Sequence, residues 1–350
     1  MIDIKLIREQ RELVRQNIKK KFQDEKLPLV DEIYELDKKF RNAKKEADDL
    51  RSQKNKLSDE IGSLMREGKK EEGLKIKEEI GAISFKIANL ESEEASLEQE
   101  VKEKMMLIPQ IIDESVPIGK DDSENVELER FGEPFVPDYE IPYHADICEA
   151  LNGLDKEAAG RTSGNGFYFL TGDIARLHSA MLAYARDFMI DKGFTYCIPP
   201  FMIRSDVVNG VMSFAEMDAM MYKIEGEDLF LIGTSEHSMI GRFKGEIVSE
   251  SDLPITLTSY SPCFRKEVGA HGLEERGLYR VHQFEKEEMV VLCKPEDAME
   301  WYNKMWQYTV EFFRSLDIPV RTLECCSGDL ADLKVKSCDV EAWSPRQQKY

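Results

Sequence analysis

Charged side chains and one phenyl ring recur in the segment FRKEVGAHGLEERGLYRVHQFEKEEM at spacings that would place them together. Side chains alternate along a strand, so Arg265 and Glu267 would share one face of a first strand. By the same rule Arg280, Phe284 and Glu288 would share one face of a second strand, joined to the first by a loop with three glycines. An arginine fork binds carboxylate or phosphate, an aromatic ring stacks on a base, and a carboxylate holds an ammonium. These residue types predict a site for a zwitterion beside a nucleotide, while a solvated edge hairpin accounts for the spacing equally well.

The strands that would carry this site belong to a globular region predicted for residues 141–350. Apolar periodicity predicts helices over 174–190 and 297–316, and the runs FTYCIPPFM and LFLIGT predict short strands. The fold class predicted for this region is α+β, with an antiparallel sheet flanked by helices.

Residues 31–108 carry two apolar seams with alternating steps of three and four, which is the pattern of a coiled coil. The first seam comprises Ile33, Leu36, Phe40, Ala43, Ala47, Leu50, Lys54, Leu57, Ile61 and Leu64. The second follows the polar turn REGKKEEG and comprises Ile76, Ile80, Ile83, Ile87, Leu90, Glu94, Leu97, Val101, Lys104 and Ile108. Leu64 would face Ile76, and the constant register continues to Ile33 and Ile108, which predicts one antiparallel hairpin. Residues 1–25 predict a short amphipathic helix, which KLPLV breaks.

The segment between arm and globular region, residues 109–140, is rich in proline, glycine and acids and is interpreted as a linker. Three parts are therefore predicted: a helical domain over 1–108 with its arm at about 31–108, the linker, and the globular domain over 141–350.

Composition limits the classes of function. A formal net charge of −20 in 350 residues argues against a protein that holds nucleic acid by bulk positive charge. A local basic stripe stays open, because charges act over only about 8–10 Å at cellular salt. Seven cysteines without a CxxC pair indicate free thiols, and the five histidines show no metal-ligand spacing. From the cysteines and histidines we expect no protein-bound metal. Because the sequence shows no signal peptide and no membrane-length apolar run, we also expect a soluble cytoplasmic protein with no membrane partner.

The segment around the predicted site resembles the second signature motif of class II aminoacyl-tRNA synthetases, F-R-x-E, a variable loop, then R-x-x-x-F. RGLYRVHQFEKEEM is similar to the corresponding block of the seryl-tRNA synthetase family. TSE at 234–236 resembles the serine-binding turn of that family, GFTYCIPPFM its first motif with Pro200, and DESVPIGKDDSENVE its linker. The likeness covers the whole chain. It implies a class II catalytic domain over 141–350, a tRNA-binding arm, and a homodimer formed through the first motif.

The resemblance implies that the site binds L-serine and ATP. The serine-binding residues would be Thr234, Ser235, Glu236, Arg265 and Glu288. The ATP-binding residues would be Arg265, Lys266, Glu267, Arg280, Val281 and Phe284. Arg265 would be the catalytic residue that bridges the serine carboxylate and the α-phosphate, Phe284 would stack on adenine, and Mg²⁺ would accompany ATP.

The implied macromolecular partner is tRNA(Ser). The family also serylates the selenocysteine tRNA, so tRNA(Sec) is a second candidate substrate. The candidate tRNA-binding residues on the arm are Lys38, Arg41, Lys45, Arg51, Lys56, Lys69 and Lys70. For any one of them, a solvated helix face is the alternative explanation.

The chain runs to DVEAWSPRQQKY, after which the family continues into an ATP-binding strand and the third class II motif. We therefore expect a C-terminally incomplete catalytic domain with little aminoacylation activity. The residues leave open a non-catalytic tRNA- or partner-binding coiled-coil protein derived from a synthetase, and also activation of an amino acid other than serine.

Overall fold

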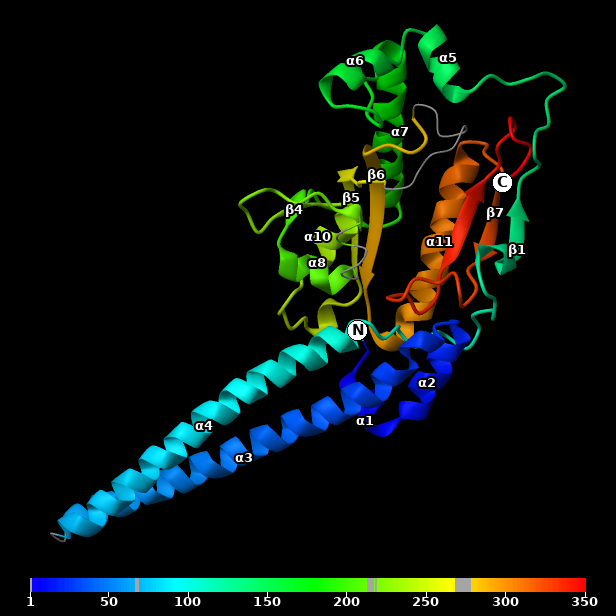
Figure 1. Ribbon diagram of the computed structural model, residues 1–350. Helices are drawn as coiled ribbons and strands as arrows, with labels where there is room; N and C mark the ends of the chain where they lie inside the picture. Colours follow the sequence, from blue (N-terminus) through cyan, green and yellow to red (C-terminus); the bar gives the residue numbers. More distant parts are fainter. Residues whose placement is uncertain (1, 67–68, 213–216, 218, 268–277) are drawn as a thin grey trace. The chain divides into compact units, whose positions relative to one another are not determined.

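The computed structural model describes residues 2–66, 69–212, 217, 219–267 and 278–350 (Figure 1). The chain divides into two compact units. The helical unit comprises Met1–Asn125 with Cys325–Ser337, and the sheet unit comprises Val126–Glu324 with Cys338–Tyr350. None of the described helices combines the length and the apolar character that crossing a membrane requires.

A long antiparallel helical hairpin dominates the helical unit, as the heptad seams predict. It pairs α3, Leu27–Arg66, with α4, Lys70–Met105, and the two helices run side by side in Figure 1. The seam residues Ile33, Ala43, Ala47, Ile83 and Ile87 are buried between the two helices. The hairpin prediction is confirmed.

The start of the helical unit differs from the sequence prediction. Residues 1–25 form two helices, α1 at Ile4–Glu9 and α2 at Arg11–Lys20, which meet at Gln10. The predicted break at KLPLV is wrong, because α3 begins at Leu27. Pro28 lies in the first turn, where a backbone N–H has no helical acceptor, so the missing donor does not interrupt the helix. The buried residues of this core are Ile2, Ile7, Val14, Ile18, Val30, Ile33, Met105 and Ile108.

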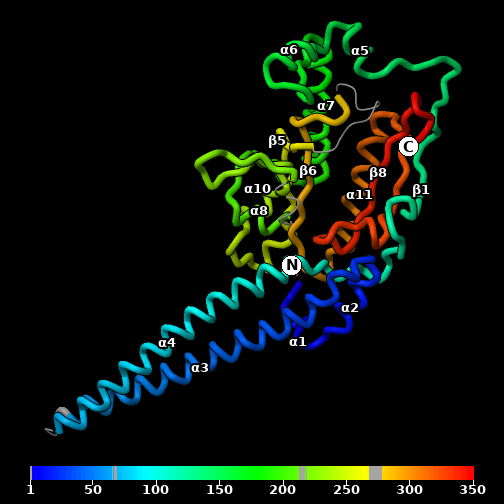
Figure 2. Tube along the Cα trace, in the orientation of Figure 1, coloured from blue at the N-terminus to red at the C-terminus, as the bar shows by residue number. Residues whose placement is uncertain are grey.

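A central antiparallel pair organises the sheet unit (Figure 2). Strand β5, Ile255–Phe264, pairs with β6, Gln283–Leu292, and the register runs from Ile255 opposite Leu292 to Phe264 opposite Gln283. The two-residue strand β2, Thr195–Tyr196, joins β5 in parallel. The strand predicted over FTYCIPPFM is thus mostly irregular, as expected from its Pro-Pro step.

A second three-stranded sheet has the order β1-β7-β8, with both pairings antiparallel. Its strands are Val126–Phe131, Val320–Glu324 and Cys338–Ala342. Strand β1 lies in the range interpreted as a linker, which is rich in acids, proline and glycine. Strands β3, Met202–Ile203, and β4, Phe230–Leu231, form a small antiparallel pair.

Helices flank the β5–β6 pair, and this arrangement confirms the α+β prediction. Met239 of α10, Ser235–Gly241, packs on Leu257 and Val290. Helix α7, Gly172–Asp191, contacts the same two strands, and α11, Ala298–Ser315, contacts β7 and β8. The shorter helices are α5 at His144–Ala150, α6 at Lys156–Thr162 and α8 at Ser205–Val211. Single 3₁₀ turns occupy Asp24–Lys26, Asp122–Glu124, Glu250–Asp252 and Pro295–Asp297.

Candidate active site

The β5–β6 register places small side chains beneath three functional ones. Cys263 lies opposite Phe284, Ser261 opposite Lys286, and Ser259 opposite Glu288. Residues directly opposite in an antiparallel pair project to the same face. Cys263, Ser261 and Ser259 are completely buried, so the larger side chains of β6 form the polar surface of this face.

Arg265 lies at the end of β5 and reaches back over this face. Its guanidinium carbon is 5.2 Å from the ring centroid of Phe284, and its Nε donates to the Gly233 carbonyl at 3.2 Å. Its backbone N–H donates to the His282 carbonyl at 3.0 Å, which extends the pairing past the strand. The arginine fork and the ring are thereby held together, and this is the association that the spacing predicts.

The remaining polar residues of the motif lie outside the strands, contrary to the prediction of shared strand faces. Strand β5 ends at Phe264 and β6 begins at Gln283, so Glu267 and Arg280 stand on the connecting segments. They still meet, because Arg280 Nη1 is 2.9 Å from Glu267 Oε2.

The loop 268–277, with its three glycines, lies outside the described residues. Lys266 donates its backbone N–H to the Met220 carbonyl at 2.8 Å, and Val281 is buried.

The TSE turn approaches the same face from α10. Thr234 caps α10 by accepting from the Glu236 N–H at 3.3 Å, and its hydroxyl donates to Glu288 at 2.8 Å. Glu236 is exposed. Ser235 is fully buried and donates to the Ser259 carbonyl at 3.3 Å, so its hydroxyl supports β5. Thr234 and Glu288 are therefore implied serine-binding residues whose side chains the structure joins directly.

Two further residues at this face were missed from the sequence. Lys286 forms an ion pair with Glu288, and its position between Phe284 and Glu288 on alternate residues of β6 was the signal that could have found it. His237 of α10 is buried, and its Nδ1 has no hydrogen-bond partner among the described residues. Burial, and then the positive charges of Lys286 and Arg265, lower the pKa of His237 from 6.5 to about 4.

His282 stabilises the backbone around the site. Its Nδ1 lies 3.0 Å from the Tyr222 hydroxyl and 3.1 Å from the Arg265 carbonyl. The backbone N–H of His282 donates to the Gly166 carbonyl at 2.8 Å. These contacts fix the segment that leads into β6.

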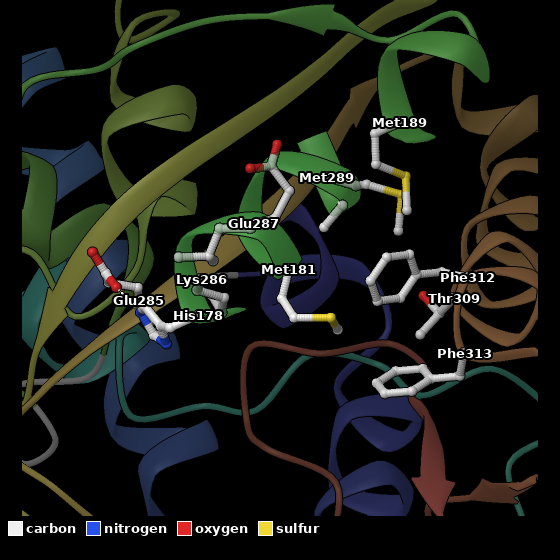
Figure 3. Close-up of a pocket in the computed structure, with 12 residues that line it drawn as sticks. His178, Met181, Met189, Glu285, Lys286, Glu287, Met289, Thr309, Phe312 and Phe313 are labelled. Carbon is white, nitrogen blue, oxygen red and sulfur yellow. Dashed lines mark hydrogen bonds and ion pairs between the residues drawn. The ribbon is translucent and has the colours of Figure 1, made fainter. Parts of the chain in front are cut away.

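The opposite face of β6 has a different character. Glu285 pairs there with Tyr260 and with His178 of α7. Thr258 donates to Glu287 at 2.6 Å, and burial raises the pKa of that carboxyl. A cavity of about 400 Å³ lies beside these residues, and Figure 3 shows the thioether of Met181 and the rings of Phe312 and Phe313 around it. Apart from the Lys286 stem, this lining shares no residue with the face that carries Arg265 and Phe284.

Lys69 is the N-cap of α4, and the other six arm candidates for tRNA binding fall into two groups. Arg41 pairs with Asp37 at 2.8 Å, and Arg51 pairs with Asp48 and Glu91, so both guanidiniums have carboxylate partners within the chain. In the part of the arm that the structure describes, no ion pair involves Lys38, Lys45, Lys56 or Lys70. Those lysines present uncompensated positive charge.

Known protein families match both units. Residues 1–112 match the seryl-tRNA synthetase N-terminal domain. Residues 221–350 match the tRNA synthetase class II core domain (G, H, P, S and T).

Curated relatives and solved structures point the same way. The chain is 38% identical over 350 residues to a serine–tRNA ligase of Methanoculleus marisnigri, covering all of this chain and 82% of that protein. It is 40% identical to a serine–tRNA ligase of Thermococcus onnurineus, covering 80% of it. It is also similar to seryl-tRNA synthetase from Pyrococcus horikoshii complexed with ATP, with a TM-score of 0.91 and 38% identity over 100% of this chain and 82% of that one. For the cytoplasmic serine–tRNA ligase of Naegleria fowleri in complex with AMP, the TM-score is 0.84 at 32% identity, covering 99% and 80%.

Proposed function

The chain belongs to the seryl-tRNA synthetase family, and on that premise we propose that its β5–β6 face activates L-serine with ATP and passes the seryl group to tRNA(Ser). One observation supports this most directly. Arg265 and Phe284 lie within 5.2 Å of each other on the face where Thr234 contacts Glu288 at 2.8 Å. A cation beside an aromatic plate suits a nucleotide, and a hydroxyl beside a carboxylate suits an amino acid with a hydroxyl side chain.

The serine half of the site would use the Thr234–Glu288 pair. Glu288 would hold the serine ammonium, exchanging its ion pair with Lys286 for one with the substrate. Thr234 is held by its capping role, so its hydroxyl stays aimed at the carboxylate without ordering on binding. Preorganised polar groups of this kind reject alanine, because its binding would leave them unpaired.

The nucleotide half would use Arg265 and Phe284. The serine carboxylate attacks the α-phosphorus of ATP, forming the carboxyl–phosphate bond of seryl-adenylate and releasing pyrophosphate. Two anions must approach for this step, and the Arg265 fork would offset the charge that develops on the α-phosphate. Phe284 would stack on adenine, and Arg280 and Glu267 would also bind ATP, as the family resemblance implies.

Mg²⁺ remains part of the proposal. This ion is usually held by one or two carboxylates together with substrate phosphates. Glu267 supplies a carboxylate beside Arg280, which is implied to bind ATP, and no group of three metal-ligating side chains occurs among the described residues. That donor set fits an ion that arrives with ATP, where it would neutralise phosphate charge.

A homodimer is also proposed. Helix α7 exposes Leu177, Met181 and Tyr184, and an apolar helix face of this kind is typical of a subunit interface. The family's role in charging tRNA makes the cytoplasm the proposed site of action, with tRNA(Sec) as a second substrate to be tried. Sedimentation of the purified chain at two concentrations measures the dimer.

The proposed function is tested by titrating the 350-residue chain with a non-hydrolysable seryl-adenylate analogue. We expect Glu288→Gln to weaken binding about 10- to 100-fold, because hydrogen bonds to charged groups contribute about 1.5–3 kcal/mol. Glu285→Gln is the matched control on the same strand and opposite face, and its affinity should stay within about threefold of the unmodified chain. Equal losses in both variants, or no binding by the unmodified chain, would contradict the assignment. Serine-dependent ATP–pyrophosphate exchange measures the catalytic activity of this chain. The low activity expected from the sequence stays a prediction until that measurement.

A further inference from the structure

Two polar side chains are buried at the C-terminal part of α2, a helix far from the candidate active site in sequence. Asn17 lies within the helix and Lys21 directly follows it, and each is 3% exposed although Val14 and Ile18 show that this side of α2 is the apolar core. Burying an amide and an ammonium is unfavourable unless both find partners, so the partners are informative.

Asn17 clamps the backbone of the segment that follows α4. Its Nδ2 donates to the Gln110 carbonyl at 2.8 Å, and its Oδ1 accepts from the Ile112 N–H at 2.9 Å. One amide thus satisfies a donor and an acceptor that no helix or strand would pair.

Lys21 clamps a segment more than 300 residues further along the chain. Its Nζ donates to the carbonyls of Leu330 and, at 3.4 Å, Ser327, and it lies 3.8 Å from Asp332. Lys26 and Gln23 hold the same carboxylate at 2.6 and 2.7 Å. Burial lowers the pKa of Lys21, while the Asp332 charge opposes that shift. The ammonium is therefore surrounded by carbonyl and carboxylate oxygens and not by solvent.

The two clamped segments also pair with each other. Ser327 and Gly328 donate to the carbonyls of Pro117 and Gly119, both at 2.8 Å. A Cβ at Gly328 would lie 2.2 Å from the Lys120 carbonyl oxygen, so only glycine permits this approach. Together they form a small hydrogen-bonded layer at the end of the helical unit.

The connectivity gives this layer its importance. Residues 325–337 join β7 to β8, two strands of the sheet unit, yet they belong to the helical unit. The chain therefore passes between the units at three places: 125–126, 324–325 and 337–338. If the 325–337 segment were released, only the first passage would still tether the helical core to the sheet unit.

We propose that Lys21 is a positioning residue that latches segment 325–337 directly to the helical unit. Asn17 supports the latch by holding Gln110, whose N–H donates to the Asp332 carbonyl at 2.8 Å. Together they restrict the motion of the arm relative to the catalytic sheet. The consequence for tRNA charging rests on the proposed function. A tRNA bound by the arm delivers its 3′ end at an effective concentration set by the stiffness of the connection. A released latch lowers that concentration without touching the site where serine is activated.

The direct test is hydrogen exchange in the full chain for Lys21→Met and Asn17→Leu, which keep side-chain volume and remove the hydrogen bonds. The backbone amides of Ser327, Gly328 and Leu330 report on the latch, since each is hydrogen-bonded within the layer. Both variants should speed their exchange at least about tenfold, with exchange in β5 and β6 unchanged. Lys20→Met is the matched control, because Lys20, the last residue of α2, is exposed and directly precedes Lys21, so its substitution should have no effect.

Other outcomes overturn the latch. Unchanged exchange at the three amides would show that Asn17 and Lys21 are dispensable. Faster exchange spread evenly through α1 to α4, or loss of folding, would show a role in core stability alone. Lys21→Gln decides the case of a poorly folded Lys21→Met, since its single amide donor should restore slower exchange at Leu330, and failure to do so counts against the proposal.

A kinetic comparison separates the latch from the proposed function. Lys21→Met should raise the KM for tRNA about tenfold and leave pyrophosphate exchange within about twofold. An equal fall in both steps contradicts the latch. If the unmodified chain binds neither tRNA nor the seryl-adenylate analogue, the proposed function fails, while the exchange measurement still decides the latch.

Discussion

At the scale of single residues, the account depends most on Arg265. This side chain donates to the Gly233 carbonyl and lies over Phe284, so its fork has a fixed orientation before any ligand arrives. Lysine would keep the charge and lose both the fork and the planar stacking. We expect Arg265→Lys to weaken ATP binding about 10- to 100-fold, measured by calorimetric titration. Arg204→Lys, at an exposed arginine, is the control, and equal effects of the two substitutions would remove Arg265 from its role.

His237 gives a prediction for pH. The folded protein disfavours the charged imidazole, with a pKa of about 4 against the ordinary 6.5. Its contribution to stability is therefore intact above pH 6.5 and is lost as the pH falls toward 4. Between pH 7 and 4.5 the free energy of unfolding should fall by about 2 kcal/mol more in the natural chain than in His237→Asn. Urea unfolding at both pH values measures this difference, and parallel curves would mean that His237 is not buried as a neutral group.

The residues of the site were predictable by type and less so by position. The alternation of β6 places Phe284 and Glu288 together, as expected from their spacing. Arg265 and Arg280 lie outside the strands, and Ser235 is buried, contrary to expectation. The ends of β5 and α10 depend on packing, which a period of two does not encode. Lys286 and His237 were not predicted as site residues, because the family resemblance assigned a binding role to neither of them.

At the scale of elements, the arm offers the clearest test. Ile87 is buried in the seam between α3 and α4, whereas Phe85 two residues earlier is 69% exposed. Ile87→Ala should destabilise the arm by about 2–4 kcal/mol through lost burial and a cavity. Phe85→Ala should change stability by less than about 0.5 kcal/mol. Hydrogen exchange in α3 and α4 measures both, and a Phe85→Ala loss as large as that of Ile87→Ala would contradict the seam.

Long periodic elements were predictable and short ones were not. The steps of three and four over two arms identify α3 and α4 without ambiguity, and α7 and α11 show the same helical period. Strands β2, β3 and β4 have two residues each, too few for a pattern to emerge. Strand β1 was hidden because its side chains are mostly exposed, so acids occupy positions that a core strand would fill with apolar residues.

At the scale of the whole molecule, charge distribution controls how tRNA would bind. The chain carries a net charge of −20, so attraction to RNA must come from local positive side chains. Lys56 has no ion pair in the described part of the arm, while Arg51 is paired with Asp48 and Glu91. Lys56→Gln should lower the salt slope of tRNA binding by about 0.7–0.9, as expected for one phosphate contact. Arg51→Gln should lower it less, and filter binding at several salt concentrations compares them. The reverse order would contradict this assignment of contacts.

The division of the molecule was only partly visible in the sequence. The shift from heptads to globular composition marks where the arm ends. The return of residues 325–337 to the helical unit has no local signature, because Lys21 is 306 residues away from its partner Ser327 and looks like an ordinary residue at a helix end. Long-range pairing of this kind follows from tertiary structure and not from periodicity.

The proposed function requires that one face of β5–β6 binds an amino acid with a hydroxyl side chain next to a nucleotide. The most direct measurement is the ratio of affinities of the 350-residue chain for seryl- and alanyl-adenylate analogues, which differ by one oxygen. We expect the chain to prefer the seryl analogue by at least about hundredfold, because the alanyl analogue leaves buried polar groups unpaired. Equal affinity for the two analogues, or binding of neither, would contradict it.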